Sequence, residues 1–398
     1  MAKARSQKTS YGNLKPVAVR RRKATQDYTL IFIVLFLITF GLIMLYSTSS
    51  YEAALDFGDS AHYLKRQLGA TIAGLAVMLV ISHFPWQFWK QIYALIYLFS
   101  VGMILLIIPF GTTVNGAKRW IYFGPISVQP AEISKFAVIV LMAVWLGYAP
   151  RRSFQGKKGP FLIMLPALFQ AALIYLVTRN LSSAIIIMVI AVGMFFVTDE
   201  HIIRYFLLVL GVIVLAVAAV LFAIKTQGGA TFRFKRILVW LDPSAYADDT
   251  GYQVLQGLYG VGSGGVFGKG LGQSMQKLGY IPEAQNDMIF SIICEELGMF
   301  GAIAIIMLFV LLCWRIMIVA NEAGSRFEAL ISVGVMIHIA IQVILNIAVV
   351  TNTIPNTGVT LPFFSYGGSS IVILLAEIGL VLGVARNNSR RMHTGGRA

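Results

Sequence analysis

The chain has 398 residues, of which 58% are apolar and 12% charged, whereas about 25% of the residues in a soluble domain are charged. This composition excludes an ordinary soluble enzyme and a disordered chain, and two cysteines, Cys294 and Cys313, are too few for a disulfide scaffold. The net charge of +15 does not indicate a nucleic-acid binder, because Lys and Arg gather at the chain ends and in short gaps rather than along one folded face.

Long apolar runs recur along the chain, as in proteins whose helices cross a bilayer. The first 27 residues are basic, and the apolar run after them is too long for a secretory signal peptide. We therefore expect an all-α polytopic integral membrane protein with about ten transmembrane helices. The predicted spans lie near 28–46, 68–84, 91–110, 131–149, 161–178, 181–198, 203–224, 288–314, 328–350 and 360–385.

The distribution of Lys and Arg over the short loops predicts the orientation, because cytoplasmic loops carry the excess of both. Both termini are predicted to be cytoplasmic, and the one large loop, between helices 7 and 8, to lie outside. The predicted organisation is a basic cytoplasmic tail at 1–27, transmembrane helices 1–7 at 28–224, an extracytoplasmic loop at 225–287, transmembrane helices 8–10 at 288–386 and a cytoplasmic tail at 387–398.

The large loop contains a glycine-rich segment, Gly262 to Gly272, that superficially resembles a nucleotide-binding loop. A Walker A loop needs Ser or Thr after Gly-Lys, but Gly270 follows Lys269, and no βαβ unit surrounds the segment. Two interpretations remain. The backbone amides approach an anionic ligand closely, or the segment is a mobile surface loop, which is the commoner outcome for glycine-rich sequence.

Asp287 stands immediately before the eighth predicted span, where a carboxylate meets both water and a lipid-borne substrate. It is a candidate general base, although Asp is also common at helix N-termini for structural reasons. Glu295 and Glu296 lie two turns into an apolar helix, where ionisable groups are costly and face a cavity or a partner.

The outer loop before the fourth span carries Lys118 and Arg119, which suit a phosphate group. Glu132 and Lys135 are three residues apart on one helix face, so they form either a structural ion pair or part of a site for an anionic, membrane-tethered substrate.

In the ninth span, Gln342 and Asn346 share one face and are expected to hydrogen-bond across helices. Broken backbone is expected at Thr357 to Ser370, which is rich in Gly, Pro and hydroxyl groups. Glu377 stands alone in the last span with no partner evident, and the five histidines show no metal-ligand spacing.

Taken together, these segments resemble the SEDS family of bacterial cell-wall polymerases, which includes FtsW, RodA and SpoVE. The sequences Asn-Gly-Ala-Lys-Arg-Trp and Pro-Glu-Ala-Gln-Asn-Asp resemble the corresponding segments of the division and sporulation members. The matching segments are Asn115–Ile121, Gln129–Lys135, Gly251–Gln253 with Gly262–Ser274, Pro282–Gly298 and Thr357–Ser370.

The resemblance implies that the chain polymerises lipid II into glycan strands on the outer face of the bacterial cytoplasmic membrane, for cell division or sporulation. It implies a class B penicillin-binding protein as the cross-linking partner, together with other divisome or sporulation proteins. Carried over by motif, the essential aspartate falls on Asp287. One departure is Asn180, which replaces an acid of the family, so no catalytic role is expected there.

The predicted chemistry is an inverting glycosyl transfer in which Asp287 is catalytic. No cofactor is required by the sequence, and a divalent cation, Mg²⁺ or Mn²⁺, is compatible with the expected diphosphate leaving group. The alternative function is a lipid II flippase, since transporters also contain buried acids and broken helices. The candidate substrate-binding residues are Lys118, Arg119, Glu132, Lys135, Lys269, Glu296 and Ser369.

Overall fold

The computed structural model describes residues 27–114, 117–124, 126–148, 159–198, 232–248 and 251–394. Within these ranges, nine helices are long and apolar enough to cross a membrane, as expected for a polytopic all-α membrane protein. The predicted span at 203–224 lies outside the described residues. The helices are α1 (Tyr28–Phe57), α2 (His62–His83), α3 (Trp86–Leu105), α4 (Ile107–Phe110), α5 (Pro130–Tyr148), α6 (Gly159–Thr178), α7 (Leu181–Thr198), α9 (Phe232–Leu241), α10 (Tyr252–Ser263), α11 (Ile289–Asn321), α12 (Arg326–Val350) and α13 (Gly368–Thr394).

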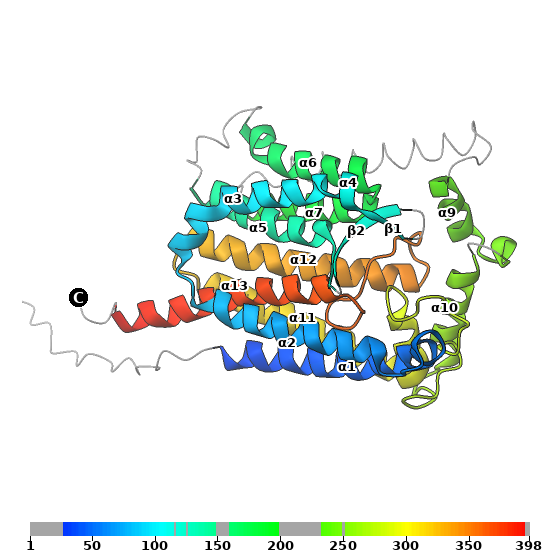
Figure 1. Ribbon diagram of the computed structural model, residues 1–398. Coiled ribbons are helices and arrows are strands. Elements are labelled where there is room, and N and C mark those ends of the chain that lie inside the picture. The colour runs from blue at the N-terminus through cyan, green and yellow to red at the C-terminus, as the bar shows by residue number, and fades with distance from the viewer. Residues whose placement is uncertain are drawn as a thin grey trace, which may run out of the picture.

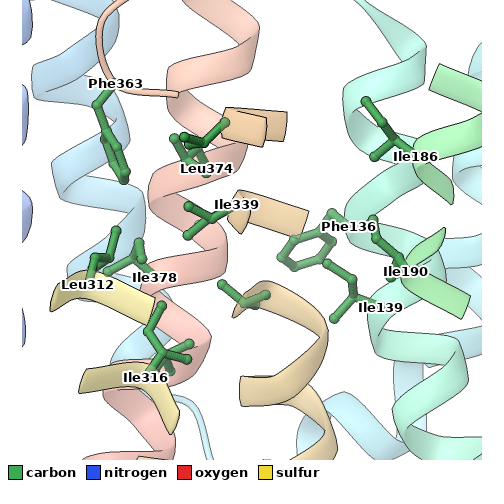
Figure 2. Packing of buried hydrophobic residues seen from close by; sticks show 14 of the residues in the cluster. Phe136, Ile139, Ile186, Ile190, Leu312, Ile316, Ile339, Phe363, Leu374 and Ile378 are labelled. Carbon is green, nitrogen blue, oxygen red and sulfur yellow. The ribbon is translucent and has the colours of Figure 1, made fainter. Parts of the chain in front are cut away.

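The long helices lie side by side in one bundle (Figure 1). Helix α5 lies deep within it, with 78% of its most apolar stretch buried, and it packs against α3, α7 and α12. Apolar side chains fill the space between the helices, as Figure 2 shows for Phe136 and Ile139 of α5, Ile190 of α7 and Ile339 of α12. Because this core is apolar, polar groups inside the bundle need partners within the protein.

The shorter elements gather at the end of the bundle opposite the C-terminus (Figure 1). They include α9, the 3₁₀ turn at Ser244–Tyr246 and α10. A small antiparallel sheet, which the sequence analysis did not predict, also lies there; it is formed by β1 (Thr112–Val114), β2 (Ala117–Phe123) and β3 (Ile126–Val128) in the order β1-β2-β3.

The last predicted span begins too early. Helix α13 starts at Gly368 and not near 360, because residues 355–367 form no helix. Pro362 lies in this segment, and Phe363 has a positive φ of 66°, which a helix cannot contain. The expectation of broken backbone between Thr357 and Ser370 is confirmed for its first eleven residues, and Gly368 to Ser370 begin the helix.

Two polar contacts on α1 lie a membrane thickness apart. At one end, the Arg315 Nε donates to both carboxylate oxygens of Asp27, at 2.9 and 2.8 Å. Towards the other end, Ser47 of α1 donates to the Glu296 carboxylate at 2.7 Å. At 1.5 Å per residue, Asp27 and Ser47 are about 30 Å apart, which is about the thickness of the hydrocarbon core. With 30 residues, α1 is therefore longer than the hydrocarbon core is thick.

Candidate functional site

Asp287 lies just before α11, at the end of the bundle that carries the short elements. Its side chain is partly exposed. The Nδ2 of Asn346 on α12 donates to the Asp287 main-chain carbonyl at 2.8 Å and to the Val359 carbonyl at 2.8 Å. One buried amide thus holds the start of α11 against the broken segment before α13; both acceptors lie outside the helices, and not on a neighbouring helix as the sequence predicted.

The Asp287 carboxylate is not a helix cap. The N-cap residue of α11 is Met288, and no side chain caps this helix. Asp27 shows what a capping acid looks like in this protein, since its Oδ1 accepts from Leu30 N at 3.1 Å. The structure therefore does not support the alternative that Asp287 is present as a helix-capping residue.

Burial, together with the nearby Glu283 charge, raises the pKa of Asp287 to about 6, although a hydrogen bond to its own backbone and the Arg236 charge oppose the shift. A carboxyl group that titrates close to neutral pH suits a general base, because it is ionised at pH 7 and still basic enough to take a proton.

Arg236 on α9 brings a cation to this site, and the sequence analysis missed it. Its Nη1 donates to the Asn356 carbonyl at 3.0 Å. One turn further along α9, Trp240 Nε1 donates to the Asn352 carbonyl at 2.9 Å. Both bonds attach α9 to the chain just after α12. The signal was Arg236 and Trp240, four residues apart in a segment that also carries Arg233 and Lys235. This segment lies in a long loop, whose charges say little about topology.

Arg119 on β2 lies within electrostatic range of Arg236, and burial together with this like charge lowers the pKa of Arg119. The buried Nε of Arg119 has no hydrogen-bond partner among the described residues. A buried guanidinium group with an unused donor and a like charge in electrostatic range suits the binding of an anion. Lys118, the preceding residue of β2, is exposed, whereas Arg119 is partly buried, and a substrate-binding role for Lys118 stays a prediction.

Glu132 and Lys135 on α5 form the predicted ion pair at 2.7 Å, and both are buried. The Nζ of Lys135 also donates to Gln342 Oε1 at 3.2 Å. Gln342 in turn donates to the Thr360 carbonyl at 3.1 Å, so the pair is tied to the broken segment.

Two serines at the start of α13 complete this network. Ser370 donates to Glu132 Oε2 at 3.3 Å, and the Ser369 hydroxyl accepts from Gln129 N at 3.2 Å. Every partner that the structure gives Glu132, Lys135 and Ser369 is therefore a group of the protein itself, and a substrate-binding role for them stays a prediction.

The glycine-rich segment packs against α11 at a bend, where Gly298 has a φ of 68°. The amides of Lys269 and Gly270 donate to the carbonyls of Glu295 and Glu296 at 2.9 Å each. A Cβ added to Gly268 would lie 2.2 Å from the Glu296 carbonyl oxygen, so only glycine fits there. These amides bind the protein's own carbonyls, which supports neither earlier interpretation of the segment.

Side chains reinforce this contact. The Lys269 Nζ lies 2.6 Å from Glu295 Oε1, and the Lys277 Nζ lies 2.8 Å from Glu296 Oε1. Ser274 also donates to Glu295. Lys269 and Glu296, both predicted to bind substrate, thus sit in ion pairs that attach the loop to α11 and α1, away from the contacts of Asp287.

Glu377 has a partner that the sequence did not reveal. Its Oε2 lies 2.7 Å from His338 Nδ1 on α12, and both side chains are buried. Asn180 is a local helix cap, since its Oδ1 accepts from Ser183 N at 3.1 Å. Within the described ranges, no three His, Cys, Asp or Glu side chains are arranged to hold a metal ion, and the metal requirement stays a prediction.

Comparisons with known proteins agree with this arrangement. The family model of FtsW, RodA and SpoVE, described as "Cell cycle protein", matches residues 28–390. The stage V sporulation protein E of Bacillus subtilis strain 168 is 38% identical over 371 residues, which is 92% of this chain and 98% of that protein. A probable peptidoglycan glycosyltransferase FtsW of Trichlorobacter lovleyi is 35% identical over 92% of this chain and 94% of its own length.

A solved structure is similar as well. The work that determined it is described as "Structural coordination of polymerization and crosslinking by a peptidoglycan synthase complex". That chain is 26% identical, superimposes with a TM-score of 0.74, and the match covers 92% of this chain and 98% of that one. On the family match and the extent of the sequence identity, this chain is a multi-pass membrane protein of the FtsW, RodA and SpoVE family.

Proposed function

We propose that this chain is a peptidoglycan glycosyltransferase that polymerises lipid II into glycan strands for cell division or sporulation. Its relatives of 35% identity are named as probable peptidoglycan glycosyltransferases, and its relative of 38% identity is named as a sporulation protein. The observation that carries the proposal is Asp287, a partly exposed carboxylate with a pKa of about 6 within electrostatic range of Arg236.

In the proposed reaction, Asp287 takes the proton from the 4-hydroxyl of the acceptor sugar. The resulting oxygen nucleophile attacks the anomeric carbon of the growing strand with inversion, and the bond from that carbon to the lipid diphosphate breaks. The leaving diphosphate carries the negative charge that develops, so the neighbouring guanidinium groups of Arg119 and Arg236 suit it. Cleavage of the diphosphate linkage supplies the free energy.

The orientation follows from the same chemistry. Both termini lie on the cytoplasmic side, and the end of the bundle with Asp287, α9 and α10 faces outward. A class B penicillin-binding protein is the proposed cross-linking partner, by analogy with the complex named in the similar structure. The reaction needs no nucleotide, and a divalent cation remains compatible with the diphosphate.

Purified protein in detergent, incubated with lipid II, tests the function. We expect glycan polymer from the wild type and none from Asp287→Asn, and a rise of roughly tenfold or more in KM for Arg236→Ala, because a charge-assisted contact to the diphosphate is lost. Lys118→Ala is the matched control, since that side chain is exposed. Polymer formed by folded Asp287→Asn refutes the base assignment, and absence of wild-type polymer favours a flippase, which needs two compartments.

A further inference from the structure

At the end of the bundle that carries Asp287, the end of α1 lies apart from α9 (Figure 1), and it is acidic. Glu52 and Asp56 lie one turn apart near the end of α1, so they project from the same face of the helix. Both act electrostatically on Tyr63 of α2, as does Glu283, which also raises the pKa of Asp287. From Asp27 to Glu52, α1 is about 37 Å long, more than the thickness of the hydrocarbon core. These carboxylates therefore stand in the aqueous layer beside Asp287.

Two like charges at this spacing destabilise a helix, and the structure gives neither Glu52 nor Asp56 an ion pair with a described Lys or Arg. The adjacent acid at this end of α1 differs, because Asp59 pairs with Lys65 at 2.7 Å. Repulsion that the fold leaves uncompensated is typical of a site for a charged ligand.

Gln285 gives independent evidence for a ligand. Its side chain is 3% exposed and lies close enough to the Glu52 carboxylate to stabilise the ionised form, yet its Oε1 has no hydrogen-bond partner among the described residues. The Gln285 carbonyl accepts from Tyr366 N at 2.9 Å, which fixes this residue two positions before Asp287. An unused acceptor beside two carboxylates calls for a donor that carries positive charge.

Aromatic rings line the same place. Tyr63 packs edge to face with Tyr366, with ring centroids 4.9 Å apart, and with Phe57 at 5.7 Å. The Phe57 ring also stacks on His62 at 3.9 Å. Tyr63 and Tyr366 are partly exposed. Carboxylates combined with aromatic rings favour an organic ammonium group, which gains both Coulomb and cation–π attraction.

We propose that Glu52, Asp56 and Gln285, with the rings of Tyr63 and Tyr366, form a subsite for a primary ammonium group carried by the peptide of the lipid-linked substrate. The inference rests on the proposed function, since it assigns the peptide to one side of Asp287 and the diphosphate to the other. The substrate would then lie between an anionic and a cationic surface, with its sugars over the carboxylate. This division of charge sets the direction in which the substrate lies across the site.

The test compares two lipid II preparations that differ in one group: a peptide with a free side-chain amine, and the same peptide with that amine acetylated. Wild-type protein in detergent is expected to bind the free-amine lipid about tenfold more tightly and to show the same ratio in KM, with kcat changed less than twofold. Glu52→Gln combined with Asp56→Asn is expected to bind both lipids equally, because the substitutions keep the shapes and remove the charges.

Asp59→Asn is the matched control and is expected to keep the tenfold preference, since Asp59 belongs to its own ion pair. Equilibrium binding needs no turnover, so the subsite is tested even if no polymer forms and the proposed function fails. Equal affinity of the wild type for the two lipids overturns the proposal, as does a preference that survives in the double variant. A bound metal ion would instead give affinities that depend on Mg²⁺ and not on acetylation, which also overturns it.

Discussion

Replacing Asp287 by Asn should abolish polymerisation and at the same time make the protein more stable at neutral pH. The carboxyl group has a pKa of about 6 in the folded chain, against the ordinary value of 3.8. The difference corresponds to about 3 kcal/mol of unfavourable free energy for holding the ionised form in the folded state. Asn has no charge to desolvate and keeps the shape of the side chain.

The pH dependence of this effect follows from its sign. Below about pH 4, Asp287 is protonated in both the folded and the unfolded chain, and the substitution gains nothing. Between about pH 4 and 6 the unfolded chain loses the proton first, so the wild type loses stability as the pH rises. Above about pH 6 the folded carboxyl is ionised too, and the advantage of Asn stays constant.

Thermal unfolding in detergent at pH 4, 6 and 7.5 measures this difference. The midpoint of Asp287→Asn should exceed that of the wild type by a few degrees at pH 7.5 and coincide with it at pH 4. Asp59→Asn is the control, because hydrogen bonds from Lys65 and Ala61 lower the pKa of Asp59, and it should not raise the midpoint. Wild-type activity should rise nearly tenfold from pH 5 to pH 7 as Asp287 ionises. A variant that melts lower than the wild type at pH 7.5 would refute the reasoning.

Two further substitutions test the packing. Gly41→Ala would put a Cβ 2.2 Å from the Phe363 carbonyl oxygen, so it should cost about 2 kcal/mol or more and lower the melting midpoint, whereas Gly69→Ala meets no atom within 4 Å and should not. His338→Leu leaves the buried Glu377 carboxyl without its partner, which should cost about 3–5 kcal/mol. The double variant with Glu377→Leu should recover most of this loss; if its loss equals the sum of the single losses, the two residues are not coupled.

The membrane spans could be predicted because long apolar runs are a local property of the sequence. The beginning of α5 at Pro130 and of α7 at Leu181 fall within one residue of the expected positions. The last span was placed too early because Leu361, Phe363 and Phe364 are apolar and buried without being helical. Hydropathy reports burial, and it does not report backbone conformation.

The site could be predicted only in part, since its contacts join residues far apart in the chain. Asp287 was found from its motif and its place at a helix boundary. The partnership of Arg236 with Asn356 and that of His338 with Glu377 depend on which helices pack together, and no spacing along the chain encodes this. The two ion pairs that hold the glycine-rich loop were missed for the same reason.

The way in which Asn346 holds the start of α11 has a practical value. The Asn346 amide donates to the main-chain oxygens of Asp287 and Val359, and these bonds involve neither of the two side chains. Every residue type has the same main-chain carbonyl, so a substitution of Asp287 keeps the hydrogen bond from Asn346. At this position the side chain carries the reactivity and the main-chain carbonyl carries the structural contact. The side chain can therefore be substituted while this contact is kept.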